Sequence, residues 1–206
     1  MSGWLVAVLA VCSAGWVSAV EVDPFKDPEI VAVHDLHQRA EKGDKRATKE
    51  LVARLEAALE AHPEHHLLKA YLGSAYTLAS RDAFPGPSKL SYLKDGLRTM
   101  DAAVEGAPDQ PAVRFIRAVN NFHLPAFVNR RDNARADFEV LVRQLKEGDH
   151  GLSAATRQAI FYYAGLAFKQ TKKPEAARAA WERGLALAPG SEMAAKIEHE
   201  LKRLRV

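Results

Sequence analysis

The sequence holds very little cysteine, and Cys12 is the single example among its 206 residues. Cys12 lies in an apolar N-terminal stretch, residues 1–19, that we expect to be removed during export. The mature chain would then have no thiol. It could not use cysteine chemistry, and it would need no disulfide in an oxidising compartment.

Long runs of one charge are also missing. The chain carries 29 Lys and Arg against 26 Asp and Glu, a formal net charge of +3, with a sequence pI near 9.0. The two signs are interleaved, which is typical of solvated helix faces rather than of a nucleic-acid footprint. The densest basic sites are Arg130–Arg131, Lys172–Lys173 and the tail at 202–205, and no base-stacking motif accompanies them. We therefore expect no nucleic-acid partner.

The usual signatures of enzymes and metal sites are absent from the sequence. No serine occupies a Gly-x-Ser-x-Gly elbow, and no glycine-rich loop could cradle a phosphate. Two histidine groups, His34-x-x-His37 and His62-x-x-His65-His66, lack the His-Glu-x-x-His spacing of zinc hydrolases. We predict no enzymatic activity, no cofactor and no bound metal.

The chain does contain a helical-hairpin motif near its C-terminus. Small and large residues recur in it at helical spacing: Phe161, Ala164, Gly165, Phe168, Ala177, Trp181, Gly184 and Pro189. The first four share one helix face, because they lie three and four positions apart. A second helix is expected to begin at Pro174 and to stop at Pro189. Small residues let the two helices approach, and the large rings fill the remaining space.

Two hairpins with weaker matches precede this motif in the first half of the chain. One spans residues 28–62, with Gly43–Asp44 between its helices. The other spans residues 69–108 and contains Leu72, Gly73 and Tyr76 of the same motif. Its two halves stay in register only if an insertion of about a dozen residues, Arg81–Ser91, separates the helices.

A third weak hairpin starts at Pro111, is broken at Leu124–Pro125 and then resumes. A last, highly charged amphipathic helix begins near Ser191 and has the pattern of a cap at the end of a solenoid. No segment shows the alternation of a strand. We therefore predict one all-α domain over residues 24–206, a solenoid of about four helical hairpins plus a C-terminal capping helix.

Residues 158–191, and residues 69–108 with their insertion, resemble the tetratricopeptide repeat (TPR) family at these motif positions. The resemblance implies a right-handed superhelix whose concave face, lined by the first helix of each pair, binds peptides or protein segments. Carried over by position, the residues facing that groove would include Ala70, Ser74, Thr77, Phe115, Val119, Phe122, His123, Ala159, Tyr162, Leu166, Lys169 and Gln170. The motif is specific for the fold and says nothing about the partner.

The insertion Arg81–Ser91 is one departure from the regular pattern, and its Pro85–Pro87 turn is stiff. In one interpretation it is a lid over the groove that displays Phe84 and is anchored by Arg81 and Asp82. In the other it is a structural loop, in which Asp82 caps or pairs locally and Phe84 packs into the core.

The third hairpin is the other departure, because Arg114, Arg117 and Asn121 fall on one helix face where the motif expects apolar residues. Charges at such positions must be paired or face a cavity, with Asp137 or Asp82 as candidate partners. One hypothesis is that the arginines line a pocket for an anionic group, such as a peptide carboxylate. The alternative is a shifted register with solvated arginines.

Residues 1–19 are typical of a secretory signal peptide, since Trp4–Val17 is largely apolar and Val17–Ala19 suits signal peptidase. The first residues contain no Lys or Arg, so an uncleaved membrane anchor and a lipid on Cys12 remain alternatives. The apolar run is shorter than the ~20 residues of a spanning helix. We expect a periplasmic or secreted protein with no membrane span after cleavage.

Two functions remain open at this point. The leading one is a non-enzymatic, exported TPR-like protein that binds a protein or peptide in the bacterial cell envelope. The other is a periplasmic binder of a small anionic ligand, associated with solute transport, with a pocket under residues 81–91. The candidate partner-binding residues are Arg81, Asp82, Phe84, Arg114, Arg117, Asn121, Tyr162 and Lys169.

Overall fold

The computed structural model describes residues 23–204, and this range contains helices but no strand. The helices, in chain order, are η1 (Pro24–Lys26), α1 (Pro28–Glu41), α2 (Lys45–Ala61), α3 (His66–Asp82), α4 (Pro87–Gly106), α5 (Pro111–His123), η2 (Ala126–Val128), α6 (Arg131–Glu147), α7 (Ala154–Gln170), α8 (Pro174–Leu187) and α9 (Glu192–Leu204). None of them is long and apolar enough to cross a membrane. The expected signal peptide at residues 1–19 lies outside the described residues.

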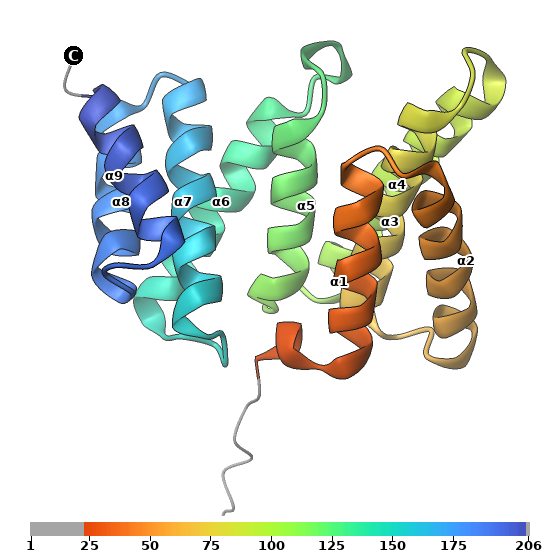
Figure 1. Cartoon of the computed structure of the whole chain (residues 1–206), viewed down its shortest axis with the longest axis horizontal. Helices are drawn as coiled ribbons and strands as arrows, with labels where there is room; N and C mark the ends of the chain where they lie inside the picture. The colour runs from red at the N-terminus through yellow and green to blue at the C-terminus, as the bar shows by residue number, and fades with distance from the viewer. Residues whose placement is uncertain (1–22, 205–206) are drawn as a thin grey trace, which may run out of the picture.

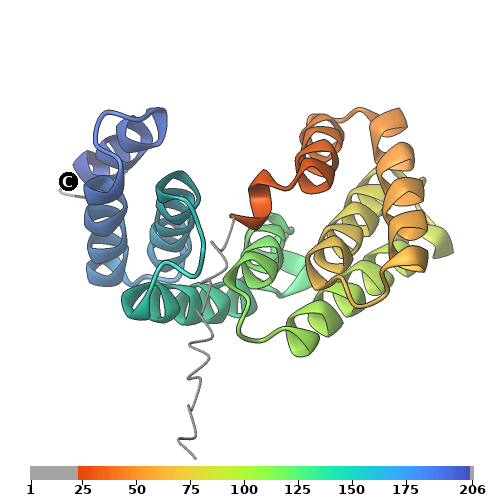
Figure 2. The same cartoon turned by 90° about the horizontal axis from the view of Figure 1, so that it is seen from below.

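The helices pair into four antiparallel hairpins, α1–α2, α3–α4, α5–α6 and α7–α8, and α9 packs on the last of them (Figure 1). A view from below shows the hairpins following one another along a curve, with α1, α3, α5 and α7 toward its inner side (Figure 2). The predicted all-α solenoid with a C-terminal helix is confirmed over the described part of the chain.

Local sequence sets where the helices begin. The side chains of Asp27, Asp44 and Ser153 accept hydrogen bonds from backbone N–H groups in the first turns of α1, α2 and α7. Proline begins four of the α-helices: Pro28, Pro87, Pro111 and Pro174. Its fixed φ suits a first helical turn, where the missing N–H would have no intrahelical partner.

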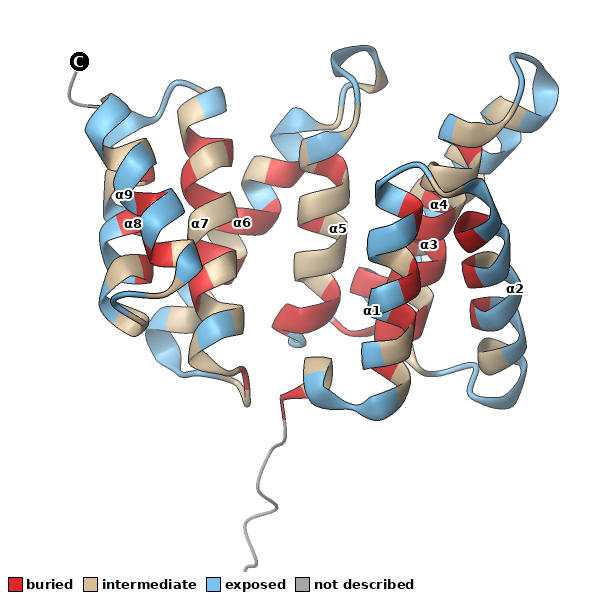
Figure 3. Cartoon of the chain, in the orientation of Figure 1, coloured by how far each residue is buried: buried red, intermediate tan, exposed pale blue. Residues whose placement is uncertain are grey.

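Buried residues lie where helices face one another within and between hairpins (Figure 3). Two hairpins depend on glycine for close approach. A Cβ on Gly73 of α3 would lie 2.7 Å from the carbonyl oxygen of Gly96 and 2.8 Å from the amide nitrogen of Met100, both on α4. In α7, Gly165 leaves room for the indole of Trp181, whose side chain is completely buried. The motif residues predicted to pack this hairpin therefore do so.

The prediction that the additional residues Arg81–Ser91 form a separate segment between α3 and α4 is wrong. Helix α3 continues to Asp82 and α4 begins at Pro87, so only Ala83–Gly86 connects them. The additional residues lengthen α4, which spans 20 residues. Proline at Pro87 starts a helix here rather than stiffening a long loop, and the segment forms a protruding helical tip instead of a lid.

Candidate functional site

Aromatic side chains gather on the inner side of the curve, on α5 and α7. This cluster, the aromatic stripe, consists of Phe115, Phe122, His123, Tyr162 and Tyr163. The Tyr163 ring lies at its centre, with centroids 6.2 Å from Phe115 and Phe122, 5.8 Å from His123 and 5.3 Å from Tyr162. Its rings are half-buried or exposed, so the stripe offers aromatic surface between two neighbouring first helices.

The segment Asp23–Lys26, here called the N-terminal strap, joins the first hairpin to the last. The Asp23 carboxylate accepts hydrogen bonds from the Ser153 backbone N–H and from Thr156 Oγ1, both at 2.9 Å. These partners lie at the start of α7, where the helix dipole also favours a negative charge. The strap therefore crosses the inner side of the curve, from α1 to α7.

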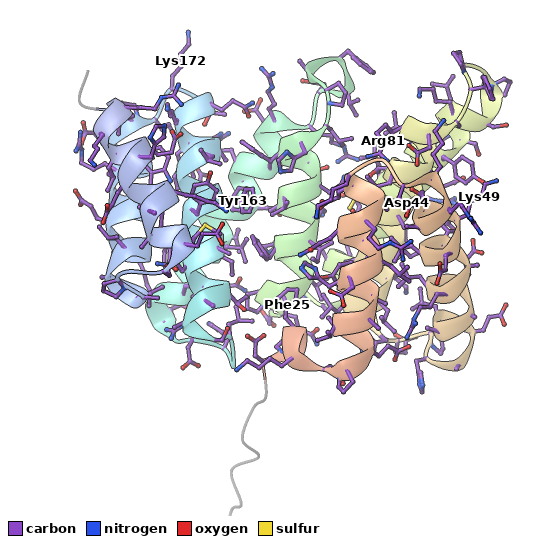
Figure 4. The ribbon with its side chains drawn as sticks, viewed as in Figure 1. Phe25, Asp44, Lys49, Arg81, Tyr163 and Lys172 are labelled. Carbon is purple, nitrogen blue, oxygen red and sulfur yellow. The ribbon has the colours of Figure 1, made fainter. Side chains whose placement is uncertain are left out.

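Phe25 in the strap adds a sixth ring beside the stripe. Its centroid lies 6.3 Å from that of Phe115 in an edge-to-face arrangement. Phe25 is labelled in Figure 4. Asp23 is only 6% exposed, and burial alone would raise the pKa of its carboxyl group. Hydrogen bonds from Ser153, Phe25 and Thr156 outweigh this and hold the pKa of Asp23 below its ordinary value.

A chain of polar side chains crosses the first helices of three hairpins. His37 Nε2 lies 2.8 Å from Ser74 Oγ, which donates to Asn120 Oδ1 at 3.2 Å, and Thr77 Oγ1 donates to the same oxygen at 2.7 Å. Burial, together with nearby His34, lowers the pKa of His37 to about 4. Ser74 and Thr77, expected to face the groove, are buried in this chain of hydrogen bonds and bind the neighbouring helices.

The arginine face of α5 binds the protein's own carboxylates. Arg114 and Arg117 both donate to Asp137 of α6, at 3.0 Å and at 2.6 and 2.9 Å, and Arg117 also reaches Asp101 of α4 at 3.1 Å. Arg130 donates to the other oxygen of Asp101 at 2.9 Å. Burial disfavours the charge on Arg117, but its hydrogen bonds to Asp137 and the negative charge of both carboxylates raise its pKa.

This network corrects both interpretations of the arginines. They are not solvated, and the anion between them is Asp137, whose side chain is 3% exposed. Of the two candidate partners, Asp137 is the one that binds them. Asn121 is 1% exposed, so it cannot line an open pocket. Its side chain lies in the packed interior, and the buried carboxylate of Asp137 takes the place of the expected ligand at the arginines.

Arg81 and Asp82 join the first two hairpins. Arg81 donates to the backbone carbonyls of Ala40 and Glu41, the last residues of α1, at 2.7 and 3.1 Å. Asp82 accepts from the adjacent Arg81 Nε at 2.9 Å, which bears out its expected local pairing, and it also accepts from Thr48 Oγ1 of α2 at 2.8 Å. The expectation that Phe84 packs into the core is wrong, since its ring is 91% exposed.

The remaining two predicted residues lie on α7. Tyr162 belongs to the aromatic stripe, and its backbone carbonyl accepts the indole N–H of Trp181 at 3.0 Å. Lys169 donates to Glu200 of α9 at 2.7 Å, with its ammonium 5.9 Å from the Trp181 ring centroid. Lys169 therefore holds the C-terminal helix in place. The eight predicted residues do not converge on one site.

Open surface hollows in the described part of the chain include two of about 380 and 490 Å³. The first lies along α4 and includes Asp101 and Arg130, and the second lies between α5 and α6 near Arg114. Neither is lined by residues 81–91. Within residues 23–204 no three His, Cys, Asp or Glu side chains are grouped so that they could hold a metal.

Sequence reasoning missed the strap and Tyr163. Tyr163 adjoins a motif position, and its place at the centre of the stripe depends on contacts with another hairpin. The strap was missed because its partners lie more than a hundred residues away. An Asp-Pro-Phe sequence before the first helix was the only local signal, and it is equally typical of a helix cap.

No family model matches the chain, and no curated protein matches it by sequence. The structure of TTC0263, a thermophilic TPR protein of Thermus thermophilus, is similar in shape, with a TM-score of 0.57 and 14% identity over 84% of this chain and 90% of that chain. A MamA structure gives a TM-score of 0.47 with 14% identity over 79% and 74%. MamA of AMB-1 gives 0.46 with 15% identity over 86% and 84%. The resemblance in fold is confirmed: the chain is a TPR-like helical repeat solenoid.

Proposed function

We propose that this TPR-like solenoid is an exported, non-enzymatic protein of the cell envelope that binds an extended segment of a partner protein on its concave side. The observation that carries the proposal is the aromatic stripe on α5 and α7. Aromatic rings supply large apolar contact area at a small entropic cost, and they are enriched where proteins bind one another.

The geometry around the stripe favours a peptide with an apolar side chain. Phe25 of the strap already packs against Phe115, so the inner side accepts a ring from a segment outside the first helices. His123 is exposed at one end of the stripe and could bond to a backbone carbonyl of the partner. A small anion is the weaker candidate, because Asp137 already occupies the arginines that would bind it.

Export to the envelope is supported by the sequence of residues 1–19 alone. The apolar run and the small residues before position 20 fit a cleaved signal peptide. Intact-mass measurement on protein recovered from the periplasm or medium tests this part. A mass that retains Met1–Ala19 would contradict cleavage.

Site-specific photo-crosslinking tests the binding side. A photoreactive phenylalanine analogue replaces Phe122 of the stripe in the full chain, and a second version carries it at Arg183, an exposed position on α8. We expect a discrete crosslinked protein from the Phe122 version and none from the Arg183 version. Absence of any crosslink at Phe122, or the same product from both positions, would contradict binding on the concave side.

A further inference from the structure

One long edge of the solenoid is formed by the connections within the four hairpins, residues 42–44, 83–86, 124–130 and 171–173, here called the turn edge. These connections lie along the upper side of the molecule in Figure 1, and the labelled residues Asp44, Arg81 and Lys172 mark it in Figure 4. The strap lies at the opposite edge, where Phe25 is labelled.

Two aromatic rings project from this edge into solvent. Phe84, in the α3–α4 connection, is 91% exposed, and Phe127, in η2 of the α5–α6 connection, is 85% exposed. They are the most exposed large hydrophobic side chains of residues 23–204, and Leu90 on the first turn of α4 is 68% exposed. Burying a phenylalanine ring lowers the free energy, and these two rings stay in water in the free protein. A contact that covers both rings is therefore favoured.

The turn edge also carries unpaired positive charge. Five exposed cations near it have no carboxylate within ion-pair distance in the described chain: Lys42, Lys45, Arg46, Arg131 and Lys172. Three carboxylates of the same edge are each held by an arginine: Asp44, Asp82 and Asp132. Glu41 and Glu175 are exposed carboxylates near the same edge, two against five cations, and Glu41 also lies 3.6 Å from His37 Nδ1, so the edge is positive.

We propose that the turn edge docks on an anionic lipid surface. Phe84 and Phe127 enter the headgroup region, where aromatic rings are favoured, and the lysines and arginines lie against the lipid phosphates. The charge separates this partner from an apolar protein surface, which would offer nothing to the cations. Docking by an edge leaves the aromatic stripe free, so this surface is distinct from the peptide-binding side.

Labels on the two edges test the orientation on lipid. The full chain with Cys12→Ser and Ala126→Cys carries an environment-sensitive fluorophore beside Phe127, and the matched chain carries it at Asp149→Cys near the opposite edge. We expect a blue shift at position 126 with equimolar phosphatidylglycerol–phosphatidylcholine vesicles and none at position 149. The shift should be absent with phosphatidylcholine alone and should weaken in about 0.5 M salt.

Substitutions test separately the contribution of the aromatic rings and that of the positive charge to lipid binding. Phe84→Ser with Phe127→Ser should weaken vesicle binding, followed by the fluorophore at position 126, about ten-fold or more. Both side chains are largely exposed, so the double substitution should leave the fold intact. Lys42→Glu with Lys172→Glu should abolish the shift, whereas Lys26→Glu with Lys146→Glu, the same charge change near the opposite edge, should not. Equal shifts at positions 126 and 149, equal shifts on neutral vesicles, or undiminished binding by the serine variant would each overturn the proposal.

Discussion

The Asp23 carboxylate and the Thr156 hydroxyl lie 133 positions apart in the sequence and 2.9 Å apart in the structure. This hydrogen bond, with its neighbour from the Ser153 N–H, connects the two ends of the solenoid across its inner side. In a repeat array each unit contacts mainly its neighbours, so a contact between the first and last hairpins restrains the curvature directly.

Asp23→Asn should lower the free energy of unfolding by about 1–2 kcal/mol, because hydrogen bonds to a charged carboxylate are stronger than those to an amide. Thr156→Val removes one of the two bonds to α7 and should cost about half as much. The folded pKa of Asp23 lies below its unfolded value near 3.8, so this stabilisation is present above that pH and is lost as the pH falls through the folded pKa. Urea unfolding at pH 7 and pH 3 measures both effects. An Asp23→Asn chain as stable as the wild type at pH 7 would contradict the prediction.

Asp137→Asn should destabilise the fold by about 3–5 kcal/mol, since it leaves the largely buried Arg114 with no carboxylate partner and Arg117 with Asp101 alone. The matched control is Glu139→Gln on the same helix, whose side chain is 41% exposed and pairs with Arg135 and Lys173. Exposed pairs contribute about 0–1 kcal/mol, so this variant should stay close to the wild type. Thermal unfolding of the two variants decides the matter: equal losses would mean that Asp137 is no more important than a surface pair.

The fold could be predicted from the sequence because its signals are local. Phe161, Gly165 and Trp181 are spaced by helical geometry alone, and such spacing determines which residues pack within one hairpin. The error at Arg81–Ser91 has a local cause too. The repeat length required additional residues between the motif positions, but spacing alone cannot distinguish a longer loop from a longer helix.

The candidate site was predictable only in part, because it depends on contacts between hairpins. The sequence identified Arg114 and Arg117 as unusual and named Asp137 as a partner, yet it could not decide between a ligand and a carboxylate of the chain. Whether the arginines bind a ligand or Asp137 depends on the distance between α5 and α6. The contact between the strap and α7 depends on the curvature of the whole array. This curvature is the sum of small rotations between successive hairpins, and no single motif encodes it.

Gly165→Ala should destabilise the protein by about 1–3 kcal/mol, because the new methyl group would overlap the buried indole of Trp181. Trp181 cannot move aside freely, since its N–H is bonded to the Tyr162 carbonyl. Gly148→Ala is the control: no heavy atom lies within 4 Å of the added carbon, and its φ of 176° is open to any residue. Chemical unfolding should separate the two alanine variants, and a Gly165→Ala chain as stable as Gly148→Ala would show that α7 and α8 can separate at little cost.

His37 should make the fold sensitive to mild acid. Its folded pKa of about 4 lies below its ordinary value of 6.5, because burial disfavours the charged imidazole. The neutral ring therefore stabilises the fold fully above pH 6.5, and this contribution is lost as the pH falls from 6.5 to about 4. At about 1.36 kcal/mol per pKa unit the complete loss is about 3 kcal/mol, an upper bound because Glu41, 3.6 Å from Nδ1, favours the charged form.

His37→Gln removes this titration while keeping a group that can bond to Ser74, so its stability should change less than that of the wild type between pH 7 and about pH 4.5. His199→Gln, at an exposed position on α9, should keep the wild-type pH dependence. Urea unfolding of the three chains across this range gives the comparison. Parallel pH profiles for the wild type and His37→Gln would show that the pKa of His37 is not lowered in the fold, with Glu41 offsetting its burial.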